Sequence, residues 1–408
     1  MIFNRKIEVI FDKKDELILD GQSKICNWLY NYLLDLIKIE FKVKKEKSEL
    51  LTGRNIRDLV PLIKLNKSFL YSVHSSPLKN TALRLLGTFE KFFKENTGFP
   101  KYKSWKHKWF SLYYDEPNKG FKLTNKNLRI SLGKNTGNKQ IRVNGKLKED
   151  MKLKETDKIK NFRLCKEKKK FYAILCIERK DLEKKNIKNF ISLDPNHKNF
   201  FVGIDHRGNS IELKQPTMIK YFDHKIDELK SKKDKCKKYS KRWRRYNKAL
   251  DNVYNKRREQ IKSFCFGVSH FIARFYDYAI IGDYTPSLET ANHDNMHRSM
   301  LNQNIIGKFR DILEWVMSKS GKAFQCIDEK DTTKTCCICG NQEKKQPNIR
   351  EFICDKCKHH LNRDINSSVN IAKKTNVLSG SDYVNWELSQ ITYNTEWDYK
   401  LSCVYFVC

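Results

Sequence analysis

Two tight cysteine pairs stand shortly before an aspartate in the C-terminal third of the chain. Cys336 and Cys339 form one Cys-x-x-Cys pair, and Cys354 and Cys357 form the other. Four thiolates at this spacing, with a linker that suits a short hairpin, are typical of a tetrahedral zinc ribbon. Because four protein ligands leave no open position for water, we expect one structural Zn²⁺ ion. Asp364 follows the second pair and is expected to open a helix.

Three neighbouring side chains are alternative ligands. Cys337 lies inside the first pair, and His359 and His360 follow the second. The spacing alone does not exclude Cys337, and either histidine could replace a cysteine. All the cysteines could instead be reduced thiols with no special role. We favour the four outer thiolates, because two tight pairs at ribbon spacing rarely arise by chance.

Asp194 and Asp364 are candidate ligands for catalytic metal ions. Asp194 ends the hydrophobic run FISLD, which is expected to be a strand. Cleaving a phosphodiester with two Mg²⁺ ions about 4 Å apart requires carboxylates that converge from separate elements. Taken singly, a strand-end Asp is often a turn former and a helix-start Asp a cap. Their combination with the cysteine pairs favours the metal site.

The net charge predicts a polyanionic partner. The chain has 82 Lys and Arg against 48 Asp and Glu, a formal charge of +34. This excess would repel itself in a compact state unless nucleic acid neutralised it. No stretch reaches the roughly 18 apolar residues of a membrane span, and the first residues, MIFNRKIEVIF, do not resemble a signal peptide. We therefore expect an intracellular protein with no membrane partner, and the 13 cysteines fit a reducing compartment.

A first candidate nucleic-acid interface is the segment GFPKYKSWKHKWF at 98–110, in which cations alternate with aromatic residues. Such a surface can hold phosphates and stack bases. The alternative is that its aromatic side chains are simply buried. The candidate binding residues are Lys101, Lys103, Trp105, Lys106 and Lys108.

A second candidate interface is the run 232–258, which contains KRWRRYNK and NKRR. Only Asp234 and Asp251 are available there for pairs between residues four apart, so a helix that grips a phosphate backbone is favoured over a solvated face. KRWRR could also be a nuclear import signal. The candidate binding residues are Lys241, Arg242, Arg244, Arg245, Arg257 and Arg258.

The elements that must position these residues can be read from apolar periodicity. With 408 residues, of which 39% are hydrophobic, the chain can form two to four packed modules. Helical spacing occurs over 22–47 and 55–97, with apolar stripes at Ile25, Trp28, Leu29, Tyr32, Leu36 and at Ala82, Leu85, Leu86, Phe89, Phe93. Strands are expected at 5–11, in a small barrel over 110–180, in a three-stranded meander over 189–213, at 278–284 and at 322–328. Helices are expected over 222–276, near 304–319 and from 364, with a polar loop after 284; the tail after 376 has no clear period.

At this point the chain resembles the transposon-associated TnpB proteins, their eukaryotic and viral relatives called Fanzor and, more distantly, type V CRISPR effectors. The resemblance covers nearly the whole chain. SSPLKNTALRLLGTFEKFF with GFPKYKSWKH is similar to the recognition and wedge region, and ISLDPNHKNFFVGID to the first RuvC motif. TTKTCCICG with CDKCKHHLNRDINSSVNI is similar to the ribbon and third RuvC motif, and is the most specific match.

The resemblance implies an α+β multidomain protein: an RNase H-like RuvC nuclease core with an inserted zinc ribbon, and an N-terminal β-barrel (wedge) with an inserted helical recognition domain. The implied boundaries are a first wedge strand at 1–20, recognition domain at 21–108, wedge barrel at 109–186, RuvC core at 187–330 with a basic helical insertion at about 222–276, ribbon at 331–360, final RuvC helix at 361–375 and a tail at 376–408.

One departure from the family pattern affects the catalytic site. Most relatives have a Glu after the second RuvC strand, whereas this strand reads AIIGDYTP and places Gly282 there. Asp283 is adjacent but would point to the opposite face of the strand. Fanzors and some close bacterial relatives share this loss and have a Glu on the strand before the ribbon, a position that Glu329 matches. Asp283 and Asp328 remain alternatives.

The resemblance therefore implies an RNA-guided DNA endonuclease that cleaves beside a short flanking motif, with guide RNA and target DNA as partners and two Mg²⁺ ions held by Asp194, Glu329 and Asp364. It would act in the nucleus if its source is eukaryotic or viral, and otherwise in the cytoplasm. The alternatives are a catalytically weakened, guide-dependent binding protein, which Gly282 favours, and a transposition accessory factor.

Overall fold

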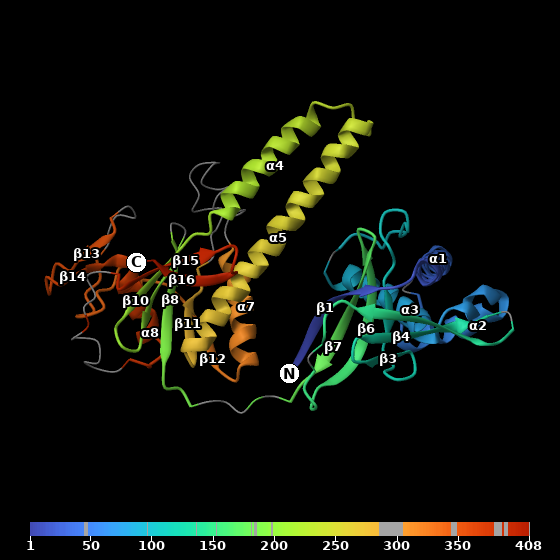
Figure 1. Ribbon diagram of the computed structural model, residues 1–408, viewed down its shortest axis with the longest axis horizontal. Coiled ribbons are helices and arrows are strands. Elements are labelled where there is room, and N and C mark those ends of the chain that lie inside the picture. The colour runs from blue at the N-terminus through green and yellow to red at the C-terminus, as the bar shows by residue number, and fades with distance from the viewer. Residues whose placement is uncertain are drawn as a thin grey trace. The chain divides into compact units, whose positions relative to one another are not determined.

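The computed structural model describes the chain apart from residues 45–47, 96, 136, 152, 181, 183–185, 197–198, 285–304, 344–348, 379–385, 387–390 and 408. The polar loop expected after 284 falls outside the described residues. The chain divides into two compact units, Met1–Lys180 and Asp181–Cys408 (Figure 1). The expected α+β multidomain class is confirmed.

The first unit contains one seven-stranded antiparallel sheet in the order β2-β6-β7-β1-β5-β4-β3. Alternate side chains of its strands are buried, for example Phe171, Ala173, Leu175 and Ile177 on β7, which is the period of a strand with one core face. The strands are β1 (Ile2–Ile10), β2 (Leu112–Tyr114), β3 (Phe121–Thr124), β4 (Asn127–Lys134), β5 (Gln140–Leu147), β6 (Lys158–Glu167) and β7 (Lys170–Glu178).

Three α-helices lie between β1 and β2: α1 (Lys13–Lys44), α2 (Gly53–Asn66) and α3 (Ser75–Lys94), with the short 3₁₀ helix η1 (Ser68–Ser72) between the last two. Helix α1 begins nine residues before the expected position 22, because Asp12 caps it by accepting a hydrogen bond from the Asp15 N–H at 2.8 Å. The last three positions of the helical run 22–47 lie outside the described residues.

The helical spacing over 55–97 is not one helix. His74 caps α3 by accepting from the Ser76 N–H at 3.1 Å, and Pro77 stands in its first turn, where its missing N–H costs nothing. The buried stripes differ from those expected: Leu29, Ala82, Leu85 and Phe89 are buried as predicted, but Ile25, Trp28, Tyr32, Leu36, Leu86 and Phe93 are only partly buried or exposed.

The second unit is built on a seven-stranded mixed sheet in the order β12-β11-β8-β9-β10-β15-β16. Strands β8 (Phe190–Pro195), β9 (Asn199–Asp205) and β10 (Ser210–Lys214) form the predicted antiparallel meander. Strands β11 (Tyr278–Gly282) and β12 (Ala323–Ile327) then add in parallel to β8. The carboxyl ends of β8, β11 and β12 therefore lie along one edge of the sheet.

Helices cover both faces of this sheet. Successive residues of β11 alternate between the two cores: Ile281 packs with α5 (Lys241–Phe275) and α7 (Ile306–Lys319), and Ile280 packs with α8 (Arg363–Lys373). A buried strand between two helical layers explains why β11 reads as a continuous apolar run. Helix α4 (Met218–Asp234) and α5 form the long antiparallel hairpin seen in Figure 1.

The described part of the tail contains two strands that periodicity did not predict. Strand β15 (Tyr393–Asp398) pairs in parallel with β10 in the register Ile211 to Tyr393, and β16 (Cys403–Val407) pairs with β15. The polar sequence YNTEWD buries only Thr395 and Trp397, so its alternation is short and weak.

Candidate active site and metal centre

Asp194 lies on β8, one residue before the end of that strand, and is 5% exposed. Leu193 pairs with Ile281 of β11, so Asp194 is next to Gly282 in the following register position. Ser367 of α8 donates a hydrogen bond to Asp194 Oδ1 at 3.0 Å. Burial, together with the negative charges of Glu329 and Asp364, holds the pKa of Asp194 well above its usual range. Asp194 is therefore close enough to the other two carboxylates to be repelled by both.

Glu329 fills the space that a side chain at position 282 would occupy. A Cβ atom added to Gly282 would lie 1.8 Å from Glu329 Oε1 and 2.4 Å from its Cδ. This proximity follows from the pairing of Gly282 with Ile327 at the end of β12, two residues before Glu329. Burial raises the pKa of Glu329 to about 7. Its Oε1 atom is buried and has no hydrogen-bond partner among the described residues.

Asp364 stands in the first turn of α8 and is 4% exposed. Asn362 caps this helix by accepting from the Asp364 N–H at 2.9 Å, so the Asp364 carboxylate is free for other contacts. Arg350 donates to Oδ1 and Oδ2 of Asp364 at 3.1 and 3.0 Å. Asn196, two residues after Asp194, donates to Oδ2 at 3.3 Å.

The hydroxyl groups of Thr332 and Ser367 connect the three segments that carry the carboxylates. Thr332 donates to the Glu329 carbonyl at 2.9 Å, and its hydroxyl lies 3.0 Å from that of Ser367, which holds Asp194. The structure thus brings together Asp194 from β8, Glu329 from the segment after β12 and Asp364 from α8. Carboxylate oxygens are the ligands that Mg²⁺ prefers. Asp194 is repelled by the charges of Glu329 and Asp364, and Glu329 Oε1 is a buried oxygen with no hydrogen-bond partner among the described residues; both features fit a divalent-cation site, because a cation would relieve both penalties.

The two alternative carboxylates each accept a hydrogen bond from a backbone N–H. Asp283 is exposed, and its Oδ1 accepts from the Glu329 N–H at 3.1 Å. Asp328 is also exposed and accepts from the Lys330 N–H at 2.8 Å. Asp283 therefore positions the backbone of Glu329.

The four outer cysteines form a compact cluster. The sulfur atoms of Cys336, Cys339, Cys354 and Cys357 all lie within 4.8 Å of one another, so the cluster could bind a structural metal such as zinc. Both pairs adopt the same turn, in which the N–H of the residue four positions on donates to the first cysteine carbonyl, from Gly340 to Cys336 and from Lys358 to Cys354, each at 2.9 Å.

The cluster does not include the alternative ligands. Cys337 is buried in the apolar core beside α8, and its N–H donates to Asn366 Oδ1 at 2.8 Å. His360 is exposed and lies 3.4 Å from the Glu351 carboxylate. Within the described chain, His359 also lies outside the sulfur cluster.

The segment that carries the four cysteines is bound to α8 by polar side chains. Its strands β13 (Glu351–Ile353) and β14 (His360–Asn362) lead directly into the helix. Asn366 Nδ2 donates to the Thr335 carbonyl at 2.8 Å, and Asn370 Nδ2 donates to the Thr332 carbonyl at 2.8 Å. The cysteine cluster and the carboxylate site therefore share α8 as a common support.

Arg350 is a site residue that the sequence analysis missed. It lies between the two cysteine pairs, two residues before Phe352 of β13, and contacts Asp364 at the start of α8. No periodicity or spacing distinguishes a single arginine in such a basic segment, so nothing in the sequence alone could have identified it.

The candidate basic residues of the first unit serve partly in packing. Trp105 Nε1 donates to Ser23 Oγ at 3.0 Å, and Lys24 Nζ lies 4.6 Å from the centroid of the Trp105 ring. Lys103 Nζ lies 4.9 Å from the Tyr30 ring centroid. The side chains of Lys101, Lys106 and Lys108 are exposed.

On the helical hairpin, Lys241, Arg242, Arg244, Arg245 and Arg258 are exposed. Arg257 differs, because its Nε lies 3.0 Å from Asp223 Oδ1 and joins α5 to α4. Its charge already has a partner within the protein, which argues for a packing role.

Comparison with known proteins gives partial matches. The family described as "Cas12f1-like, TNB domain" matches residues 307–371, the segment that contains Glu329, the cysteine cluster and Asp364. A curated relative, the putative transposase R186 of Acanthamoeba polyphaga mimivirus, is 29% identical over 164 residues. That match covers 38% of this chain and 33% of the relative, so this chain spans about a third of its length.

Among solved structures, the chain is similar to the protein of a Cas12f1-sgRNA-target DNA complex, with a TM-score of 0.64 and 13% identity over 89% of this chain and 83% of the other. The mini-RNA-guided endonuclease CRISPR-Cas_phi3 matches with a TM-score of 0.49 and 10% identity over 91% and 92% of the two chains. The first match shows a shared fold. In the described part of the chain, no helix is long and apolar enough to cross a membrane.

Proposed function

We propose that this protein is an RNA-guided DNA endonuclease of the TnpB and Fanzor class, with a RuvC-type active site in its second unit. The observation that carries the proposal is the Glu329 carboxylate lying over Gly282 beside Asp194. An antiparallel meander followed by two strands parallel to its first member supports an RNase H-like core. A glycine whose space is filled by a neighbouring carboxylate supports the relocation of the glutamate.

Asp194, Glu329 and Asp364 would hold two Mg²⁺ ions. When bound, Mg²⁺ supplies charge at the scissile phosphate and lowers the pKa of the attacking water. The protein contributes orientation: Ser367 holds Asp194, Asp283 holds the backbone of Glu329, and Arg350 holds Asp364. Asp194 and Asp364 are buried and Glu329 is partly buried, so bulk solvent has limited access to the first two carboxylates.

The four-cysteine cluster would hold one structural Zn²⁺ ion, since four thiolates leave no position for a substrate. In this proposal, residues 331–360 are the zinc ribbon and residues 187–330 and 361–375 the RuvC core. Residues 1–20 and 109–186 are the wedge, and residues 21–108 are the recognition domain.

Guide RNA and target DNA are the proposed partners. The charge of +34 and the exposed cations of α5 suit a polyanion. In enzymes of this kind, guide pairing chooses the sequence and the protein grips the heteroduplex backbone and reads a short flanking motif. The proposed location is the nucleus if the source is eukaryotic or viral.

A guide-dependent binding protein without activity is the rival, and the transposase relative also leaves a transposition accessory role open. Gly282 alone would favour the inactive protein. Glu329 favours the enzyme, because its Oε1 is a buried carboxylate oxygen without a hydrogen-bond partner among the described residues, which is costly unless function maintains it.

Sequencing the RNA that copurifies with the protein tests the proposal. We expect one predominant RNA with a constant scaffold and a variable end, and we expect it to raise the unfolding temperature of RNA-free protein. Heterogeneous host RNA alone, with no stabilising species, would remove the main support for a guided enzyme.

A further inference from the structure

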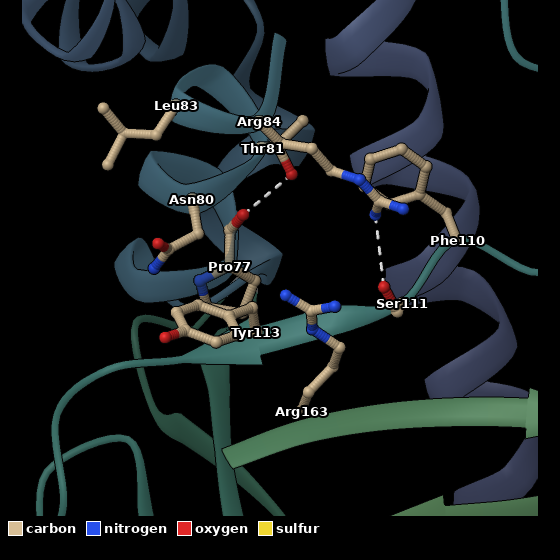
Figure 2. Close-up of a pocket in the computed structure, with 9 residues that line it drawn as sticks. All are labelled: Pro77, Asn80, Thr81, Leu83, Arg84, Phe110, Ser111, Tyr113 and Arg163. Atoms are coloured by element: carbon tan, nitrogen blue, oxygen red, sulfur yellow. Dashed lines mark hydrogen bonds between the residues drawn. The ribbon is translucent and has the colours of Figure 1, made fainter. Parts of the chain in front are cut away.

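A cavity of about 330 Å³ lies in the first unit, between the N-terminal half of α3 and strands β2 and β6 (Figure 2). Two arginines, Arg84 from α3 and Arg163 from β6, extend their guanidinium groups into it. Asn80, Ser111 and Tyr113 add polar groups to its wall. None of the residues that line it is acidic.

Strand pairing places Arg163 there. Arg163 pairs directly with Tyr113 of β2, and its guanidinium carbon lies 5.1 Å from the Tyr113 ring centroid. Leu112 and Tyr114, on either side of Tyr113, are fully buried on the other face of the sheet. Because side chains alternate along a strand, Tyr113 and its partner Arg163 point away from that face, and both line the cavity together with residues of α3.

Arg84 lines the same cavity from helix α3. Its guanidinium carbon lies 4.6 Å from the Phe110 ring centroid, and its Nη1 donates to Ser111 Oγ at 3.1 Å. Burial lowers the pKa of Arg84, and the charge of Arg163 is the next cause. The two guanidinium groups therefore repel each other across the cavity.

Arg84 and Arg163 are exposed, and they differ in their partners from two partly buried cations of the same unit. Arg179 pairs with Asp157 at 2.6 Å, and Lys166 pairs with Asp20 at 2.8 Å. Neither Arg84 nor Arg163 forms an ion pair with any carboxylate in the described part of the chain.

Asp115, the acidic residue directly after β2, already has partners of its own. Asp115 lies 2.8 Å from Lys79 Nζ, and its backbone N–H donates to Ser76 Oγ at 3.0 Å. An arginine pair held on aromatic rings without a counter-ion is an arrangement suited to an anion from outside.

We propose that Arg84 and Arg163 clamp one phosphate group of a bound nucleic acid in this cavity. Each guanidinium presents parallel N–H donors that match phosphate oxygens, and the rings of Phe110 and Tyr113 fix the planes of the two forks. The cavity exceeds the volume of a phosphate, so Asn80 and Tyr113 could contact the adjoining sugar or base. That the phosphate belongs to a nucleic acid rests on the proposed function; the anion site itself does not.

Inorganic phosphate tests the anion site. Titration calorimetry at constant ionic strength, with the full-length protein, should show binding to wild type and at least a tenfold weaker affinity for the Arg84→Gln, Arg163→Gln double variant. The matched control is Arg129→Gln with Arg142→Gln, two exposed arginines of β4 and β5 that remove the same charge outside the cavity. Equal phosphate affinity in the two double variants would overturn the site. A loss of fold is recognised by circular dichroism, and the single variant Arg163→Lys, which keeps the charge and loses the fork, should then show the weakened binding.

Two nucleic acids distinguish the source of the phosphate. The salt dependence of binding should be measured for the copurifying RNA and for a target DNA duplex. For the nucleic acid whose phosphate enters the cavity, the Arg84→Gln, Arg163→Gln variant should reduce the magnitude of the slope of log binding constant against log salt concentration by roughly one, as loss of one phosphate contact predicts. The slope for the other nucleic acid should not change. Unchanged slopes for both, relative to the Arg129, Arg142 control, would overturn the nucleic-acid assignment. Because Asp194→Asn should keep phosphate binding and lose cleavage, failure of the catalytic proposal is distinguishable from failure of this one.

Discussion

A glycine at the end of β11 makes room for a carboxylate from the next segment. Any side chain at position 282 would begin 1.8 Å from Glu329 Oε1, so the two residues are mutually exclusive occupants of one space. The absence of the expected glutamate at position 282 and the presence of Glu329 are therefore two aspects of one arrangement. In the proposed enzyme, glycine at position 282 is therefore required, because Glu329 occupies the space of its side chain.

Glu329→Gln should abolish cleavage, because it removes the charge that would hold a metal ion and keeps the size. Single-turnover cleavage should fall about 100-fold or more, while guide and target binding persist. Asp328→Asn, an exposed neighbour, is the matched control and should cleave normally. If Glu329→Gln cut at a near wild-type rate while Asp283→Asn did not, Asp283 would be the ligand.

Arg350 should stabilise the metal-free protein through its contact with Asp364. The Arg350 side chain is 34% exposed and that of Asp364 6%, so Arg350→Gln should cost about 1–2 kcal/mol of unfolding free energy, between an exposed and a buried pair. Added Mg²⁺ should recover more stability in this variant than in wild type, since it would replace the lost positive charge. Chemical denaturation with and without Mg²⁺ measures both, and an equal effect of Mg²⁺ would contradict this role.

At the scale of elements, α8 joins the cysteine cluster to the carboxylate site. Asn366 and Asn370 bind carbonyls of the segment 332–335 that leads into the first cysteine pair, and Asp364 opens the same helix. Loss of the cluster should therefore release the helix and its carboxylate together.

Cys354→Ser should reduce the folded yield before it reduces the turnover of molecules that remain folded, since the metal would hold structure. Metal analysis of wild type should find about one zinc per chain. A folded, active preparation with less than roughly 0.3 zinc per chain would rule out the zinc assignment.

The α4–α5 hairpin offers a second element-scale test. Neutralising Arg242, Arg244 and Arg245 together should leave the zinc content unchanged. It should reduce the magnitude of the slope of log nucleic-acid binding constant against log salt concentration by about two. Arg257→Gln is the contrast: it should destabilise the hairpin with little change of slope, because Arg257 already pairs with Asp223. An unaltered slope in the triple variant would mean that this face of α5 is merely solvated.

At the scale of the whole molecule, local sequence patterns predicted the helices and strands better than they predicted which strands pair with one another. The meander, β11, β12 and α7 were found from periodicity, and their registers explain why Asp194 and Gly282 are adjacent. The strands of the tail were missed because β15 pairs with β10, which lies far back in the sequence. Such pairing depends on tertiary structure, which no local period records.

In the candidate site too, the sequence indicated individual residues but not their contacts with one another. Spacing identified the four cysteines, and resemblance pointed to Glu329. Sequence could not show that Glu329 occupies the space over Gly282, that Arg350 contacts Asp364, or that Trp105 is tied to Ser23. Each of these contacts joins segments whose proximity only the folded chain establishes.

Exchange of the guide is the most direct test of the central claim. The protein should be purified with its copurifying RNA and with an RNA whose variable end has been replaced, and each complex mixed with two DNA targets in Mg²⁺. We predict that each complex cuts only its complementary target, beside the same flanking motif, and that Asp194→Asn cuts neither. Cleavage of both targets alike, or the same choice of target with either RNA, would contradict RNA-guided cleavage.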